Sequence, residues 1–251
     1  AAHKPERIGV GFGGPVEIAK GTVAVSHQVE GWSGFPLHNW LHDLSGLPVV
    51  IENDASAAAL GEYTFGVSQG YRNVLHATLG TGIGGGIILD GKLYKGRDGL
   101  AGEIGHLVFN PSGKQCKCGA RGCLETLASG SAFADQAQSL ISDGQSPILE
   151  SIAKNQKPTA EMLYAAAIKG EKAAIETIQN GGRLIGLGLV SLINILNPDV
   201  VTLSGGLLNM GNLLTGPLRK TIQLQKYGSA KQTPVLETKL GGNCGLFGAA
   251  A

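Results

Sequence analysis

Three of the four cysteines in this sequence lie close together, and a histidine precedes them. The residues are His106, Cys116, Cys118 and Cys123, spaced His-x9-Cys-x-Cys-x4-Cys. A Cys-x-Cys pair is badly placed to form a disulfide, whereas Gly119 and Gly122 allow tight turns around an ion. We predict a tetrahedral zinc site that is structural, because four protein ligands leave no open position. The alternative is a group of unliganded thiols. Cys244 is interpreted as a small buried side chain.

Two carboxylates flank this metal-binding pattern. Glu103 precedes it and Glu125 follows it by two residues, so a bound ion would fix the loops that carry both side chains. Composition alone favours the alternative, which is solvated surface charge. The pattern therefore makes both residues candidates for a site beside the ion.

A glycine-rich segment, residues 80–86, is a candidate for binding phosphate. Residues without a Cβ atom let several backbone N–H groups converge on one anion, and Thr78 and Thr81 add hydroxyl donors. The segment matches neither of the common nucleotide-binding motifs, because a strand and a hairpin follow it instead of a helix. The alternative is that these glycines only shape a bulged turn.

Asp54 stands where a predicted strand, residues 49–51, meets an alanine-rich predicted helix, residues 55–63. The carboxyl ends of strands are where α/β sheets place their ligands. Asn53 or Asp54 would also make a good helix cap, and capping is the more common role for an aspartate at such a position. The position alone leaves both roles open.

The chain alternates between short apolar strands and helices. Further strands are predicted over residues 8–12, 74–78 and 200–203, and a further helix over residues 37–44. Asp90-Gly91 between apolar runs predicts a hairpin, with its first strand at residues 87–89. The sequence is then mostly helical up to residue 199. A change in character at residues 71–73 favours a domain boundary there.

Composition excludes several classes of protein. The 251 residues hold 20 Lys and Arg against 19 Asp and Glu, and no basic block, so a nucleic acid is not expected as the main partner. The longest apolar stretch, residues 184–196, is interrupted and shorter than the roughly 18 residues that a bilayer span needs. The first eight residues lack the apolar core of a secretory signal. We expect a cytoplasmic protein.

Four motifs, taken in order, resemble the ROK family of sugar kinases and sugar-responsive repressors. They are Glu52-Asn53-Asp54-Ala55, Leu79-Gly80-Thr81-Gly82-Ile83-Gly84-Gly85-Gly86, Gly102-Glu103-Ile104-Gly105-His106 and Cys116-Lys117-Cys118-Gly119-Ala120-Arg121-Gly122-Cys123-Leu124-Glu125. The resemblance covers almost the whole chain. It implies an α/β protein with the actin-like ATPase (ribonuclease H-like) fold, in which two α/β domains flank a cleft.

The resemblance also implies domain boundaries. Residues 1–72 would be the remainder of a small amino-terminal domain that carries the catalytic aspartate. Residues 73–240 would form the large domain that binds nucleotide, zinc and sugar. Residues 241–251 would start a helix that returns to the small domain.

Carried onto this sequence, the family pattern makes Asp54 the base that accepts a proton from the C6 hydroxyl of a hexose, which then attacks the γ-phosphate of ATP. The other sugar hydroxyls would be bound by Asn53, Glu103, His106 and Glu125, together with Asp54. His106 would also bind zinc. The nucleotide phosphates would contact Thr81, Gly82, Gly84 and Gly85, and the adenosine would contact Gly205 and Gly206. Mg²⁺ would accompany ATP.

The resemblance favours a glucokinase, with other hexoses and polyphosphate left open as substrates, and implies a homodimer or homotetramer. The alternative is the sugar-sensing domain of a ROK repressor, which would carry a DNA-binding helix-turn-helix ahead of this region. The complete glycine segment beside Asn53-Asp54 favours the enzyme. ROK kinases begin with an Asp-x-Gly-Gly-Thr turn that this sequence lacks, and Gly242-Asn243-Cys244 replaces acidic residues. We therefore expect an amino-terminally truncated chain that is inactive and poorly soluble by itself.

Overall fold

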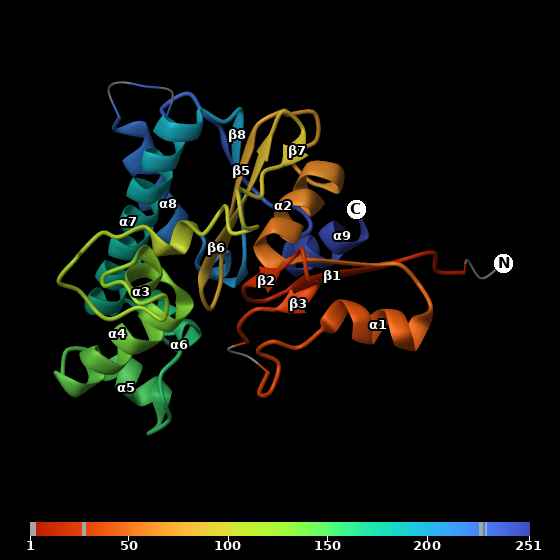
Figure 1. Cartoon of the computed structure of the whole chain (residues 1–251). Helices are drawn as coiled ribbons and strands as arrows, with labels where there is room; N and C mark the ends of the chain where they lie inside the picture. Colours follow the sequence, from red (N-terminus) through yellow and green to blue (C-terminus); the bar gives the residue numbers. More distant parts are fainter. Residues whose placement is uncertain (1–3, 27–28, 226–227, 229) are drawn as a thin grey trace.

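The computed structural model describes residues 4–26, 29–225, 228 and 230–251, and over these residues it shows a mixed α/β fold (Figure 1). Strands gather into two two-stranded sheets and one five-stranded sheet within this part of the chain. Most of the predicted elements are confirmed, with bounds that differ by a few residues. No helix among the described residues combines the length and the apolar character needed to cross a membrane.

The first part of the chain builds a small apolar core. Its elements are β1 (Ile8–Phe12), β2 (Val16–Glu17), β3 (Thr22–Val23), α1 (Leu37–Ser45) and β4 (Val49–Asn53). Strands β1 and β4 pair in parallel, so their carboxyl ends lie together and Phe12 stands opposite Asn53. The core consists of Phe12, Val16, Val23, Leu37, Val49 and Ile51. This packing fixes the end of β4 from which the predicted catalytic aspartate follows.

The second part of the chain is built on the five-stranded sheet. Its strands are β5 (Val74–Leu79), β6 (Ile83–Leu89), β7 (Lys92–Leu93), β8 (Val200–Ser204) and β9 (Val235–Glu237), in the order β7-β6-β5-β8-β9. Strands β5, β8 and β9 are parallel, while β5, β6 and β7 form an antiparallel meander. Asp90 and Gly91, with φ angles of 50° and 77°, make the predicted hairpin turn.

Helices cover both faces of this sheet. The helices that follow β7 in the chain are α3 (Leu124–Ala128), α4 (Gly130–Ser142), α5 (Pro147–Ala153), α6 (Ala160–Ile168), α7 (Lys172–Leu196) and α8 (Asn212–Gln223). They lie on one side of the sheet and share a large apolar core with Leu75, Ala77 and Leu79 of β5. Helix α2 (Asp54–Phe65) covers the other face and contacts β5 and β6 (Figure 1).

Helix α2 connects the two parts of the molecule, because it contacts β1 and β4 as well as β5 and β6. The last helix, α9 (Cys244–Ala250), packs on α2 and β1. Glycine makes this close approach possible, since a Cβ atom on Gly248 would lie 1.6 Å from the carbonyl oxygen of Ala57. The N-terminus of α2 is therefore held between the two parts of the fold.

One sequence expectation about the strands is wrong. The first strand of the hairpin was expected at residues 87–89, after a glycine loop, but β6 already begins at Ile83. Three consecutive glycines have a low intrinsic preference for strands. Tertiary contacts override that preference, because β6 pairs with β5 on one side and packs against α2.

Candidate active site

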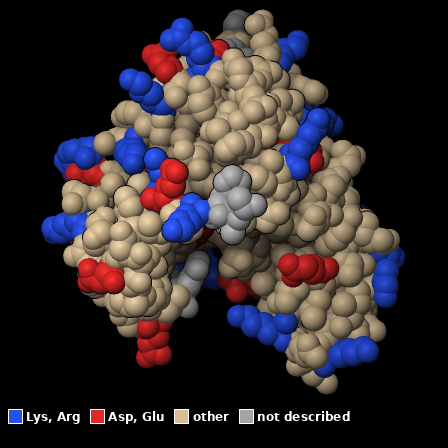
Figure 2. Space-filling view, turned by 90° about the vertical axis from the view of Figure 1, so that its right-hand side faces the viewer, with Lys and Arg blue, Asp and Glu red and all other residues tan. Residues whose placement is uncertain are grey.

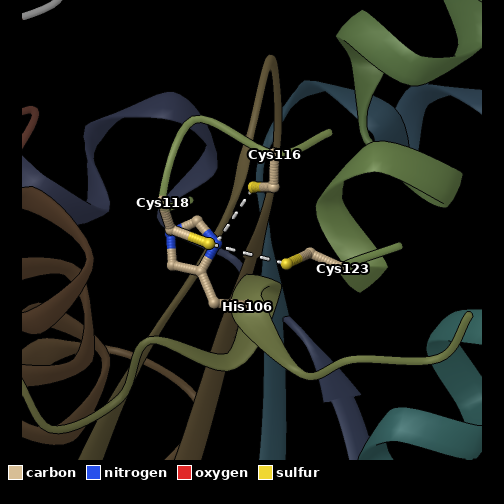
Figure 3. Close-up of side chains that lie close together, drawn as sticks. All are labelled: His106, Cys116, Cys118 and Cys123. Atoms are coloured by element: carbon tan, nitrogen blue, oxygen red, sulfur yellow. Dashed lines mark hydrogen bonds between the residues drawn. The ribbon is translucent and has the colours of Figure 1, made fainter. Parts of the chain in front are cut away.

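The predicted metal ligands lie together in the structure (Figure 3). One ligand atom from each of His106, Cys116, Cys118 and Cys123 lies within 4.8 Å of all the others. Nδ1 of His106 is 3.5 Å from Sγ of Cys116, and the Sγ atoms of Cys118 and Cys123 are 3.6 Å apart. A tetrahedral zinc site with bonds of about 2.3 Å to sulfur has ligand separations of roughly 3.8 Å. The donor set and its spacing therefore fit a Zn²⁺ ion.

The glycines that the sequence analysis assigned to turns have the expected backbone conformation. Gly119 and Gly122 have φ angles of 95° and 65°, which side chains with a Cβ atom rarely adopt. A Cβ atom on Gly122 would also lie 1.7 Å from the carbonyl oxygen of Asn110. These turns bring Cys116 and Cys118 back to Cys123, which precedes the first residue of α3.

Electrostatics favours a cation among these thiols. Burial and the nearby Cys118 and Cys116 side chains raise the pKa of Cys123 to about 12. A hydrogen bond from the backbone of Ala120 lowers the pKa of Cys118. Thiolates packed this closely repel one another, and a divalent ion removes that repulsion.

Asn53 and Asp54 divide two tasks at the start of α2. The Oδ1 atom of Asn53 accepts hydrogen bonds from the backbone N–H groups of Ala55 (3.0 Å) and Ser56 (3.1 Å), so Asn53 is the helix cap. Its Nδ2 atom donates to the carbonyl oxygen of Gly14 (3.4 Å). Oδ1 of Asp54 accepts from the N–H group of Ala55 (2.8 Å), and no other described residue donates a hydrogen bond to its carboxyl group.

The environment of Asp54 suits a base. The residue is accessible to solvent, yet the surrounding protein desolvates its carboxyl group and raises its pKa. Backbone hydrogen bonds oppose this effect without cancelling it. A carboxylate with a raised pKa accepts a proton more readily than an ordinary one does.

The structure brings the other predicted sugar ligands into the neighbourhood of Asp54. Burial raises the pKa of Glu103, His106 lowers it, and the charges of Glu125 and Asp54 raise it further. Nε2 of His106 lies 3.7 Å from a carboxylate oxygen of Glu103, so the nitrogen that does not face the cysteines faces this carboxylate. Glu125 accepts a hydrogen bond from the backbone N–H group of Ile83 (3.0 Å). Three separate segments, at residues 53–54, 103–106 and 125, thus supply polar groups to one place.

The predicted nucleotide residues do not form one continuous loop. Thr81 and Gly82 lie in the short turn between β5 and β6, where a Cβ atom on Gly82 would lie 2.5 Å from a carboxylate oxygen of Glu125. Gly84 and Gly85 lie inside β6, which corrects the expectation of a loop through residue 86. A Cβ atom on Gly84 would lie 2.8 Å from that of Ala55, so the close packing of α2 explains this glycine.

Gly205 and Gly206 lie beside the β5–β6 turn. Strands β5 and β8 are parallel, so both chains leave the sheet at the same edge. Gly205 has a φ angle of 100°, and a Cβ atom there would lie 2.2 Å from the carbonyl oxygen of Leu79. The space around Gly206 is open. Ligands of α/β sheets bind at such carboxyl-terminal edges.

Two polar groups near this site were missed by sequence reasoning. His76 is fully buried in β5, and Glu52, at the end of β4, forms an ion pair with Lys95 (2.6 Å). Glu52 also accepts a hydrogen bond from the backbone N–H group of Asn53 (3.0 Å). The alternation of side chains along β5 indicates that residue 76 faces away from the large apolar core. No local pattern in the sequence pairs Glu52 with Lys95, because they are far apart in the chain.

The chain matches the model of the ROK family over residues 1–251. The chain belongs to the ROK family. It is 35% identical to a glucokinase from Halalkalibacterium halodurans over 251 residues. This alignment covers 98% of this chain and 76% of that protein. The chain is also 33% identical to a xylose repressor from Caldicellulosiruptor bescii. That alignment covers 88% of this chain and 55% of the repressor.

A solved structure gives the same relationship in three dimensions. The ROK family glucokinase from Streptomyces griseus, in complex with glucose and AMPPNP, superimposes with a TM-score of 0.86 and 37% identity, and covers 99% of this chain and 81% of that chain. This ROK protein therefore has the predicted actin-like ATPase fold.

Proposed function

We propose that this ROK protein transfers the γ-phosphoryl group of ATP to the C6 hydroxyl of a hexose, with glucose as the substrate. One observation carries the proposal: the charges of His106, Glu125 and Asp54 all act on the Glu103 carboxyl group, so these four side chains lie near one another. Its glucokinase relatives support the same activity. The β5–β6 turn and Gly205-Gly206 supply open backbone beside these groups.

In the proposed reaction, Oδ2 of Asp54 accepts the proton of the C6 hydroxyl while the hydroxyl oxygen attacks the γ-phosphorus. A new phosphorus–oxygen bond forms to the sugar, the bond to the bridging oxygen of ATP breaks, and ADP leaves. Mg²⁺ bound with ATP would neutralise the charge that develops on the phosphoryl oxygens. The raised pKa of Asp54 makes this proton transfer more favourable.

The remaining polar groups would select the sugar. Glu103 and Glu125 offer carboxylate acceptors, and Asn53 retains one N–H group of its side-chain amide for a hydroxyl. Acceptors and donors at fixed positions penalise a sugar that leaves them unpaired. Zinc bound to Nδ1 of His106 would fix the ring so that Nε2 faces Glu103 and the sugar.

Thr81, Gly82, Gly205 and Gly206 would contact the nucleotide. Thr81 is exposed in the β5–β6 turn, and its carbonyl oxygen accepts a hydrogen bond from Ser131 at the start of α4 (3.1 Å). This contact ties the turn to a helix. Gly84 would act indirectly in this proposal, by letting α2 lie close to β6, and Gly85 would do so by letting Gly102 and Ile104 approach the other face of the strand.

We also propose the domain division at residues 1–72, 73–240 and 241–251. Two of the three apolar clusters among the described residues support it, one built from residues 12–51 and one from residues 75–230, while the third packs Leu60 and Tyr63 of α2 against the five-stranded sheet. At the proposed boundary, Oδ2 of Asp199 accepts hydrogen bonds from the backbone N–H groups of Arg72 (3.1 Å) and Asn73 (2.8 Å). A cytoplasmic location and a dimer or tetramer stay predictions. Size-exclusion chromatography with light scattering measures the oligomeric state.

The second candidate is a sugar-sensing domain without kinase activity, which the xylose repressor relative supports. A coupled assay for ADP release distinguishes the two functions when it is run on the full-length protein with ATP and glucose, mannose, fructose or N-acetylglucosamine. Polyphosphate replaces ATP in a parallel arm, in which the sugar phosphate is measured because no ADP is released. Phosphorylated glucose is the expected product. Tight glucose binding without phosphoryl transfer from either donor would instead support the sensor.

A further inference from the structure

The imidazole of His76 is the centre of a buried polar network that the proposed reaction does not use. His76 is completely buried, and its Nδ1 atom lies 2.8 Å from the hydroxyl oxygen of Thr202. Its Nε2 atom lies 2.9 Å from the hydroxyl oxygen of Ser204. Thr202 and Ser204 are buried residues of the neighbouring strand β8. The ring therefore links the two parallel strands at the centre of the sheet.

The network lies on the face of the sheet that α2 covers. His76 pairs with Gly86 across the β5–β6 ladder, and a Cβ atom on Gly86 would lie 2.5 Å from that of Ala59 in α2. Residues directly opposite in an antiparallel ladder share one face of the sheet. Leu75 and Ala77 belong to the apolar core on the opposite face. His76 thus lies between the sheet and the helix that carries Asp54.

Thr78 extends the network toward the proposed nucleotide site. Its hydroxyl oxygen lies 3.3 Å from Nε2 of His76 and 3.3 Å from the hydroxyl of Ser204, and the residue is only half-buried. Thr78 pairs with Gly84, which contacts Ala55 next to Asp54. Two residues after Thr78 the β5–β6 turn begins, and Gly205 directly follows Ser204.

Stability alone gives no reason for an imidazole at this position. A buried polar ring costs free energy unless its nitrogens are hydrogen-bonded, and apolar side chains at positions 76, 202 and 204 together would fill the same space without that requirement. Desolvation lowers the pKa of His76 to about 4, although the charge of Glu62 opposes the shift. The ring is therefore neutral near pH 7, with one N–H donor and one acceptor nitrogen. Such a ring gives the hydroxyls on its two sides defined orientations.

We propose that His76 is a positioning residue for the nucleotide, because its Nε2 atom fixes the hydroxyls of Thr78 and Ser204 where β5 and β8 lead into the proposed phosphate and adenosine contacts. This inference rests on the proposed kinase function. It assigns separate tasks to the two ring nitrogens. Nε2 serves the nucleotide site, and Nδ1 anchors the ring to Thr202.

Two amide variants separate these tasks. In His76→Asn the amide reaches the position of Nδ1, so it retains the Thr202 contact and loses Nε2. In His76→Gln the amide reaches the position of Nε2, so it retains the contacts with Ser204 and Thr78. Thr202→Val is the matched control, because it removes only the partner of Nδ1.

Calorimetry on the full-length protein measures the dissociation constants of ADP with Mg²⁺ and of glucose. We expect His76→Asn to raise the Kd of ADP about tenfold, as the loss of oriented hydrogen bonds implies, and to leave the Kd of glucose within about twofold. His76→Gln and Thr202→Val should keep the Kd of ADP within about threefold of wild type. Equal ADP affinities for the Asn and Gln variants would overturn the inference. So would an equal loss of ADP and glucose binding in His76→Asn.

Ser204→Ala replaces His76→Asn if the latter does not fold. It removes the hydroxyl that faces Nε2, and a rise of about tenfold in the Kd of ADP is again expected. An unchanged Kd would contradict the proposal. A wild-type protein that neither binds ADP nor phosphorylates a hexose would contradict the kinase function itself, whereas an active wild type with indistinguishable amide variants contradicts only the role of His76.

Discussion

At the scale of single residues, the start of α2 shows how neighbouring side chains share one backbone feature. Asn53 satisfies two free N–H groups of the helix, so Asp54 is not needed as the cap. Oδ1 of Asp54 accepts a hydrogen bond from the N–H group of Ala55, and Oδ2 is the atom that we propose as the base. The sequence left capping and catalysis open for these residues, and the structure assigns the cap to Asn53.

The first prediction concerns Asp54 as a base. Asp54→Asn in the full-length protein is expected to lower turnover by roughly a thousandfold, because an amide keeps the shape but accepts no proton. Glucose affinity should stay within about tenfold of wild type. A coupled assay and calorimetry measure the two quantities, with Asp43→Asn on the exposed side of α1 as the control. Retention of more than about a tenth of wild-type turnover removes Asp54 from this role.

The second prediction concerns stability and pH. Burial raises the pKa of Asp54 above 3.8, so the folded protein holds this proton at pH values where the unfolded chain has released it. The contribution of Asp54 to the free energy of unfolding therefore falls as pH rises from about 3.8 through the raised pKa. At pH 7, Asp54→Asn should melt at the same temperature as wild type or above it, and the difference should vanish near pH 4. Thermal unfolding at both pH values tests this; a variant that melts below wild type only at pH 7 contradicts it.

At the scale of elements, two devices position the site. The cysteine loop holds η1 (Ile104–His106) against the start of α3, and so relates Glu103 to Glu125. Gly84 and Gly86 of β6 let α2 approach the sheet. Each device fixes the location of a carboxylate of the proposed site: the loop acts on Glu103 and Glu125, and the glycines act on Asp54.

The third prediction is one zinc ion per chain, bound by the His106, Cys116, Cys118 and Cys123 cluster. Cys118→Ser should lose the metal and weaken sugar binding roughly tenfold or more, because the loops that carry the carboxylates lose their anchor. Elemental analysis and calorimetry measure these effects. Cys244→Ser is the matched control, since Cys244 lies outside the cluster and should keep the metal. Wild-type protein purified without chelator and free of stoichiometric zinc would disprove this assignment.

The fourth prediction tests the contact between α2 and β6. Gly84→Ala places a methyl group 2.8 Å from Cβ of Ala55, which should cost about 1–3 kcal/mol of stability. Displacement of Asp54 should also lower turnover, by about tenfold or more. Urea unfolding and the kinase assay measure both effects. Ala55→Gly in the same chain should restore part of each loss, and Gly242→Ala, in open space, should be neutral. Equal stabilities and equal turnover for Gly84→Ala and Gly242→Ala would refute the packing argument.

At the scale of the whole molecule, contacts between the two parts of the fold lie close to the site. Glu52 belongs to β4, and Lys95 follows β7 of the five-stranded sheet, so their ion pair joins the two parts next to Asn53. Elsewhere the charges are dispersed: Figure 2 shows a face on which acidic and basic side chains are interspersed among uncharged residues. No large region of one sign is visible on this face.

The fifth prediction concerns this ion pair. The Glu52 side chain is 9% exposed and that of Lys95 is 42% exposed, so Lys95→Met leaves a nearly buried carboxylate without its partner. The expected loss in the free energy of unfolding is about 1–3 kcal/mol, measured by urea unfolding. Glucose binding should also be weaker, because the ion pair lies next to Asn53. Lys172→Met is the control, because Lys172 and Glu176 are 89% and 64% exposed and such pairs contribute less than about 1 kcal/mol. Equal costs for both variants would show that the position of the pair between the two parts is irrelevant.

The sequence by itself determined features that depend on near neighbours along the chain. The spacing of His106, Cys116, Cys118 and Cys123 was sufficient to predict a metal site, since the ligands come from a short loop. Helix α2 and the Asp90-Gly91 hairpin likewise follow from local pattern and turn chemistry. With the family motifs added, the fold followed as well.

Only the tertiary structure decided what depends on residues far apart in the chain. Gly84 is part of a strand because α2, which begins thirty residues earlier in the sequence, packs against it. His76 is polar and buried because Thr202 and Ser204, 126 and 128 positions away, supply its partners. Local preference carries no information about such contacts, whereas burial and hydrogen bonding across the sheet fix them.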